Sequence, residues 1–226
     1  TCAALVGFFI VALPLLFGGD DASDDPEHLR LGGEALKILA VNVAAAALLF
    51  IDMLFAKHHF SGVDTGYFGA ASTVAKTIPY GVGLIALVSM PSAAAARHTS
   101  RDSLRHILRA VALLAIVGIV AALLIVALFA KQLISVTYGP HYTGAIALLP
   151  LYAIDEALLA GWAVASSYLV AIGQYRLFGY MLTAVVVEAV CMAWFGTTPL
   201  RLLTIGIATN AALAPTIWML ALRSLK

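Results

Sequence analysis

The chain has 226 residues, of which 62% are hydrophobic and 11% are charged, and its formal net charge is +1. A typical soluble domain has about 45–50% apolar and about 25% charged residues. Too little polar surface therefore remains to cover a water-soluble globule, which excludes an ordinary soluble enzyme, a nucleic-acid-binding domain and a disordered tail. The composition predicts a polytopic membrane protein.

Hydropathy along the chain predicts about seven membrane spans. A crossing helix needs about 20 mostly apolar residues, because a rise of about 1.5 Å per residue must cover about 30 Å of hydrocarbon. No alternating pattern typical of β-barrel strands occurs, so the expected fold is an all-α integral membrane bundle. The spans are expected at residues 3–17, 35–56, 67–96, 107–130, 145–172, 178–195 and 200–222. Prolines within or beside these spans should bend or end their helices, namely Pro79, Pro91, Pro150 and Pro215.

Basic residues predict the orientation of the bundle. Arg97, Arg101, Arg105 and Arg109 lie between or beside the third and fourth spans, so this loop is expected to be cytoplasmic. Most of the other basic residues then fall on the same side, together with the C-terminal Lys226. The four arginines recur every four residues and should share one helix face. They either bind anionic lipid head groups or a phosphorylated substrate, or simply fix the topology.

Ionisable residues inside the spans are the strongest functional candidates, because each costs about 2.5–3.5 kcal/mol at the helix centre on insertion scales. One hypothesis is that Lys76 lines a polar cavity and binds an anionic group, while the acids bind cations or protons. The alternative is that Lys76 pairs with Asp52, or with an acid of the fifth span, and only stabilises the bundle. The intramembrane set is Asp52, Lys76, Asp155, Glu156 and Glu188.

The sequence contains no recognised enzyme signature. His-Glu-x-x-His, phosphate-loop, Gly-x-Ser-x-Gly and Cys-x-x-Cys motifs are absent, so neither catalysis nor a cofactor is expected. Cys2 and Cys191 fit no metal spacing and are expected to be buried thiols. The adjacent His58 and His59 are interpreted as interfacial residues, and the three tryptophans as interface or packing residues.

Four local patterns carry a family resemblance. The first is Asp52 near the end of a span, followed by DTGYFGAA at 64–71, and the second is Met-Pro-Ser at 90–92 before the basic loop. The third is YGPHYTGA at 138–145, and the fourth is YLVAIGQYR at 168–176. In this order the chain resembles the C-terminal half of the polysaccharide and lipid-linked oligosaccharide flippases, in the multidrug/oligosaccharidyl-lipid/polysaccharide exporter superfamily.

The resemblance implies one bundle of a two-bundle flippase that moves an undecaprenyl-diphosphate-linked oligosaccharide across the plasma membrane by alternating access. Lys76 and Asp52 would then contact the substrate, with proton or sodium coupling through Asp155 or Glu188. Residues 1–18 would be the truncated last span of a missing N-terminal half, 19–34 an acidic cytoplasmic linker and 35–226 a six-helix bundle. Three alternatives are a cation-coupled multidrug exporter of the same superfamily, a glycan-transferring membrane enzyme and a structural bundle without transport.

Overall fold

The computed structural model describes residues 27–96 and 101–224, and these ranges are almost entirely helical, with no strand among them. Six segments of this described part are long and apolar enough to cross a membrane, which confirms the prediction of a polytopic all-α membrane bundle. The first expected span, the start of the linker and Cys2 lie outside the described residues. The helices are α2 (Glu27–His59), α3 (Gly62–Ala75), α4 (Thr77–Ala96), α5 (Arg101–Tyr138), α6 (Thr143–Ala171), α7 (Leu177–Phe195) and α8 (Pro199–Arg223).

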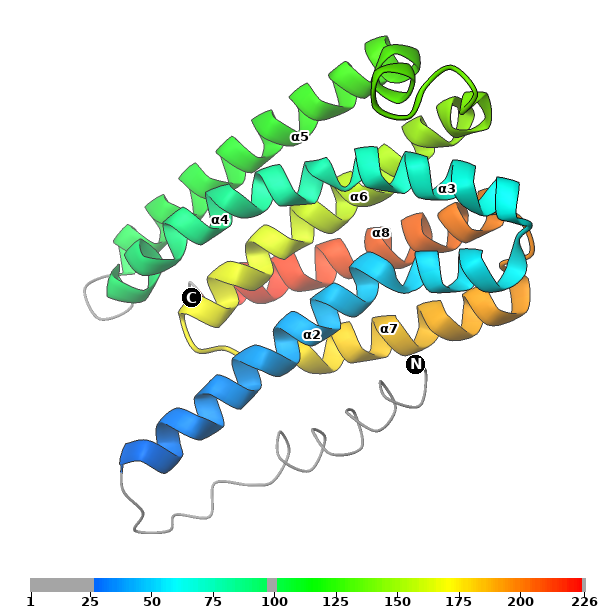
Figure 1. Ribbon diagram of the computed structural model, residues 1–226. Helices are drawn as coiled ribbons and strands as arrows, with labels where there is room; N and C mark the ends of the chain where they lie inside the picture. Colours follow the sequence, from blue (N-terminus) through cyan, green and yellow to red (C-terminus); the bar gives the residue numbers. More distant parts are fainter. Residues whose placement is uncertain (1–26, 97–100, 225–226) are drawn as a thin grey trace.

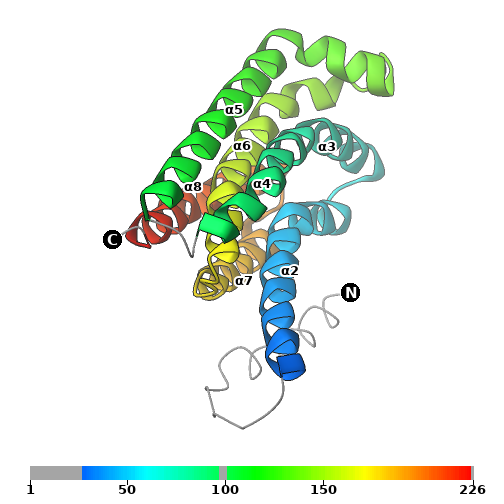
Figure 2. The same cartoon turned by 90° about the vertical axis from the view of Figure 1, so that its left-hand side faces the viewer.

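Helix α6 forms the centre of the bundle. It packs against α3, α4, α5 and α8, while α7 packs against α2 and α8 on the other side (Figure 1). The view turned by 90° also places α6 between α5 and the α2–α7 layer (Figure 2). Helix α6 is therefore in contact with other helices around most of its circumference, although a few of its side chains, such as Ile154, are exposed.

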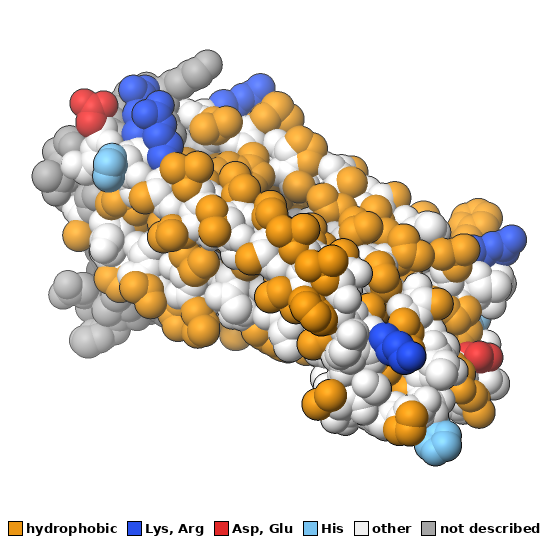
Figure 3. All heavy atoms as spheres, turned by 90° about the horizontal axis from the view of Figure 1, so that it is seen from above, with side chains coloured by type: hydrophobic (Ala, Val, Ile, Leu, Met, Phe, Trp, Pro, Cys, Tyr) orange, Lys and Arg blue, Asp and Glu red, His pale blue; other side chains and the backbone are white. Residues whose placement is uncertain are grey.

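Helix α5 instead presents an apolar surface to the outside. Exposed leucine, isoleucine and valine side chains, such as Leu113, Val117, Leu124 and Leu128, follow one another along it. Figure 3 shows apolar side chains over the middle of this face of the molecule and charged ones towards its two ends. A continuous apolar belt of this kind is typical of a surface that contacts lipid.

Glycines allow two tight turns between the central helices. Gly139, between α5 and α6, has φ +93°, and Gly173, between α6 and α7, has φ +75°, both in the left-handed region that favours glycine. The second turn is closed by the backbone N–H of Gln174, which donates to the carbonyl of Leu169 at 2.9 Å. Because the turn at Gly139 reverses the chain within a few residues, α6 runs antiparallel to α5 and directly beside it.

Two of the segments that carry the family resemblance pack against each other. The ring of Tyr67 on α3 lies 6.0 Å from that of Tyr142, which precedes α6. A Cβ added at Gly144 would overlap the Tyr67 ring, so a larger residue there would force that ring to shift. These aromatic and small residues therefore contribute to the packing of α3 against the beginning of α6.

The expected third span is two helices separated by a break at Lys76. Pro79 has no N–H to donate to the carbonyl of Ala75, and α3 ends at that residue. The other prolines, Pro91, Pro150 and Pro215, lie inside continuous helices and end none of them. A separate kink in α5 occurs at Phe129, where φ is −126° and ψ is 19°. No proline or glycine marks that kink in the sequence.

Candidate intramembrane charge cluster

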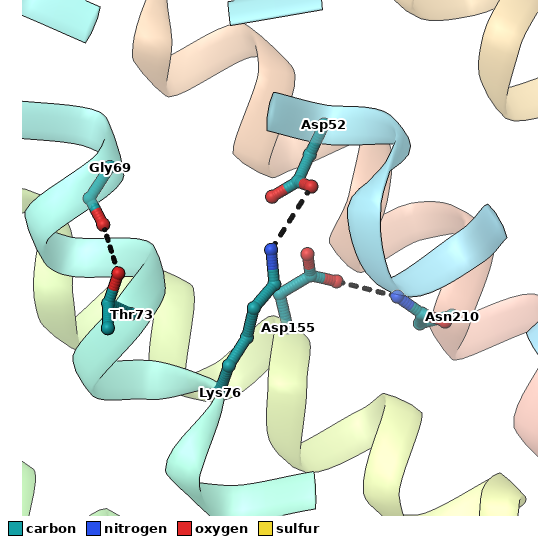
Figure 4. Close-up of polar contacts among 6 residues, drawn as sticks. All are labelled: Asp52, Gly69, Thr73, Lys76, Asp155 and Asn210. Atoms are coloured by element: carbon teal, nitrogen blue, oxygen red, sulfur yellow. Dashed lines mark hydrogen bonds and ion pairs between the residues drawn. The ribbon is translucent and has the colours of Figure 1, made fainter. Parts of the chain in front are cut away.

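The break between α3 and α4 places the Lys76 side chain inside the bundle. Its ammonium lies 3.4 Å from Oδ1 of Asp52 on α2, and the two residues are 5% and 6% exposed. Figure 4 shows the Lys76 side chain extending towards Asp52, with the Asp155 carboxylate beside it. The ammonium also lies 5.0 Å from the ring centre of Phe50 and 5.6 Å from that of Tyr152, distances that allow cation–π attraction. The contact between Lys76 and Asp52, one of the alternatives that the sequence left open, is therefore present.

Asp155 is held by a chain of hydrogen bonds between α6 and α8. The Asn210 amide Nδ2 donates to Oδ1 of Asp155 at 2.8 Å, and the indole N–H of Trp162 donates to Oδ1 of Asn210 at 2.9 Å (Figure 4 shows the first of these). Gly206 makes room for the carboxylate, because a Cβ there would lie 2.5 Å from Oδ2 of Asp155. Asp155 is thus fixed in position by neighbours on two helices.

Glu156 and Glu188 are buried without the same support. Each is 2% exposed, and the Oε2 atom of each has no hydrogen-bond partner among the described residues. Glu156 interacts electrostatically with Lys76, Asp52, Asp155 and Glu188, although it lies on a different side of α6 from the Asn210 contact. Glu188 on α7 also interacts with Asp155 and Asp52.

All five of the ionisable residues that the sequence places inside the spans belong to one buried cluster. We define the intramembrane charge cluster as the buried ionisable residues of α2, the α3–α4 break, α6 and α7. Among the described residues it has one basic and four acidic side chains. Its members are Asp52, Lys76, Asp155, Glu156 and Glu188.

The predicted row of arginines lies at the beginning of α5 and is not part of the intramembrane charge cluster. Arg105 and Arg109 are exposed, and Arg105 forms a weak ion pair with Asp102 at 3.9 Å. Arg101 begins the helix, whereas Arg97 lies outside the described residues. Exposure at a helix end is consistent with contact with lipid head groups and with a topology anchor.

Sequence reasoning missed the neutral residues that organise the cluster. Asn210 is 1% exposed and joins two other buried side chains, yet a single amide in an apolar span gives only a weak signal. Trp162 is fully buried, as a packing residue rather than an interface residue. Gly206 is recognisable only once α6 and α8 are known to touch.

Other possible sites differ in chemistry from the cluster. Within 27–96 and 101–224, no three His, Cys, Asp or Glu side chains converge to hold a metal ion. A groove of about 640 Å³ between α7 and α8 is lined mainly by apolar side chains and by Thr183, Thr209 and Thr216. Cys191 lines this groove and is partly exposed, so the expected burial of that thiol is incomplete.

No protein-family model, curated protein or solved structure matches the chain.

The arrangement of the buried charges defines what the site can do chemically. A buried ammonium can exchange one anionic partner for another, and buried carboxyls can bind protons or cations. Such residues inside a membrane are typical of transport pathways and of structural ion pairs.

Proposed function

We propose that the chain forms one bundle of a membrane transporter that moves a diphosphate-linked glycan lipid across the plasma membrane by alternating access. The observation that carries the proposal is Lys76, a buried ammonium at a helix break inside a membrane bundle. Ionisable side chains inside a membrane bundle face its interior and mark candidate transport pathways. The four sequence patterns support the substrate class, since they resemble those of lipid-linked oligosaccharide flippases.

The geometry of Lys76 suits a binding residue that exchanges partners. Its 3.4 Å contact with Asp52 is longer than the roughly 2.7–2.9 Å of a strong charge-assisted hydrogen bond. A diphosphate oxygen of the substrate would replace the Asp52 carboxylate as the partner of the Lys76 ammonium. After the substrate is released, the ammonium would pair with Asp52 again. Lys76 and Asp52 are therefore our proposed substrate-binding residues, and Asp155 and Glu188 our starting candidates for proton or sodium coupling.

The bundle would have a fixed orientation in the membrane and a second bundle beside it. The C-terminus and the beginning of α5 would face the cytoplasm, where the exposed Arg105 and Arg109 would contact anionic lipid head groups. A second bundle of the same protein would complete the substrate cavity. The protein would need no metal or organic cofactor, and no enzymatic step is proposed.

A deletion and complementation experiment tests this function. The gene is deleted in its own host, and lipid-linked oligosaccharide is assayed in the inner leaflet with and without the full-length wild-type copy. Accumulation that the wild-type copy relieves supports a flippase. Normal levels of the lipid-linked glycan in the deletion strain would contradict it.

Two variant copies of the gene distinguish substrate binding by Lys76 from simple ion pairing with Asp52. Lys76→Met removes the cation, and Asp52→Leu/Lys76→Met removes both charges, with Lys131→Met as the exposed-lysine control. We expect the double variant to regain normal protein abundance but not export. If it regains both, the pair is structural and Lys76 does not bind substrate.

A cation-coupled multidrug exporter is the second candidate, and the charge balance of the cluster favours it. The intramembrane charge cluster has four acids and one lysine among the described residues, and Lys76 already has Asp52 as its partner. Such an exporter would bind a cationic drug at the acids and would not depend on Lys76 as a ligand. New sensitivity of the deletion strain to cationic drugs, without glycan accumulation, would favour this function.

A further inference from the structure

The intramembrane charge cluster has more acidic groups than its neighbours can satisfy. If every member were ionised, one ammonium would face four carboxylates, all of them at most 8% exposed. An isolated buried charge is far more costly than a neutral group, particularly inside a bilayer. Asp52 has Lys76 and Asp155 has Asn210, but the Oε2 atoms of Glu156 and Glu188 have no partner in the described part of the chain.

Adjacent residues on α6 therefore differ in what they can do. Asp155 is wedged against Gly206 and receives a hydrogen bond from Asn210, whose other side is fixed by Trp162. A carboxyl group held in this way resists movement and has one oxygen already occupied. Glu156 has a free acceptor atom and a longer side chain, and it lies in the field of Lys76.

We infer that Glu156 and Glu188 are the proton-binding carboxyls of the transport cycle, and that Asp155 is a positioning residue that joins α6 to α8. The inference rests on the proposed transport function and identifies its coupling ion. Oε2 of each glutamate would take a proton from water on one side of the membrane and return it on the other. A proton needs only one oxygen atom, whereas hard metal cations need several oxygen ligands at once.

Proton binding would be linked to the state of Lys76. The charged groups that interact electrostatically with Glu156 are Lys76 from the α3–α4 break, Asp52 from α2, Asp155 from its own helix and Glu188 from α7. The residue that α8 contributes, Asn210, is neutral, and so is Tyr152 of α6. Neutralising Glu156 reduces the negative charge around the ammonium and frees it for an anionic ligand. Protons and a diphosphate group should therefore strengthen each other's binding.

Infrared difference spectroscopy tests the inference without relying on transport. The full-length protein is reconstituted in liposomes and exposed to pH jumps, and the C=O stretch of protonated carboxyls is recorded. We expect pH-dependent signals that are lost in part in Glu156→Gln and in Glu188→Gln. Asp155→Asn should keep both signals, and Asp64→Asn provides an exposed-acid control.

Isotope labelling keeps the test decisive if a variant fails to fold. In the wild-type protein, labelled glutamate must shift the signals and labelled aspartate must leave them in place. Signals that follow aspartate would overturn the assignment, as would signals that respond to added sodium at constant pH. A further overturning result is the absence of any pH-dependent carboxyl signal.

The two proposals fail in different experiments. Glutamate signals with normal glycan levels in the deletion strain would leave the proton site intact and remove the flippase function. Glycan accumulation in the deletion strain without glutamate signals would support the flippase function and remove the proton site. Where both hold, an imposed pH gradient should drive glycan movement in liposomes with the wild-type protein and with Asp64→Asn, but not with Glu156→Gln.

Discussion

Helices α5 and α6 are neighbouring membrane-spanning helices with opposite surroundings. In the apolar stretch of α6, 50% of the residues are buried inside the protein, against 11% in that of α5. Residues 110–130 of α5 contain no charged side chain, whereas α6 has Asp155 and Glu156 side by side. Lipid surrounds much of the first helix and protein surrounds the second.

The difference shows where a membrane protein can keep polar groups. Lipid offers no partner to a carboxylate, so α5 tolerates only apolar side chains along its middle. Other helices supply α6 with the amide of Asn210, which bonds to both Asp155 and Trp162, and with the ammonium of Lys76. Substitutions should therefore have large effects around α6 and small ones on α5, and three predictions test this contrast.

The largest effect is expected for Lys76→Met. Removing the ammonium leaves Asp52 buried without its partner, and breaking a buried ion pair from one side costs about 3–5 kcal/mol. The free energy of unfolding, measured by SDS titration in mixed micelles, should fall accordingly. Asp52→Leu/Lys76→Met should recover most of the loss, because no unpaired charge remains. Equal destabilisation in both variants would show that the pair itself is not the source.

A smaller loss is expected for Asn210→Leu. The substitution leaves both the Asp155 carboxylate and the Trp162 indole N–H without a partner, so we expect about 2–3 kcal/mol of destabilisation. Thr137→Val on α5 serves as the control, since its hydroxyl only bonds back to Leu133 within its own helix. Unchanged tryptophan fluorescence together with unchanged stability in Asn210→Leu would argue against the hydrogen-bond chain.

The smallest of the three effects contrasts two glycines. Gly206→Ala places a Cβ against Asp155, which Asn210 holds in place, and overpacking of this kind should cost about 1–2 kcal/mol. At Gly118 on α5 the nearest atom to an added Cβ is 3.9 Å away, so Gly118→Ala should not destabilise the protein. Thermal unfolding in detergent compares the two variants directly. A tolerated Gly206→Ala would mean that α6 and α8 can separate there.

Much of the fold could be predicted from the sequence. Length and hydropathy give the spans from α2 to α8, because the bilayer imposes the same requirement on every crossing helix. Pro79 marks the break at Lys76, since a missing N–H is visible in the sequence. The pairing of Lys76 with Asp52 was one of two alternatives, and the structure contains that contact.

Contacts between distant helices could not be predicted in the same way. Nothing local distinguishes Asp155 from Glu156, and their difference depends on which one α8 meets through Asn210. The α5 kink at Phe129 likewise has no marker in its residues. Tertiary packing decides both, and hydropathy does not record which helix lies beside which.

The break at Lys76 also has a consequence for biogenesis. A lysine at membrane depth makes the α3–α4 segment a poor candidate for entering the bilayer by itself, because it adds about 2.5–3.5 kcal/mol to the cost of insertion. Its partner Asp52 lies 24 residues earlier in the chain, on the helix that emerges from the ribosome just before it. If α2 waits beside the insertion channel, the two charges can enter lipid together as a neutral helical hairpin. The ion pair would then be assembled during synthesis, before α6 exists to surround it.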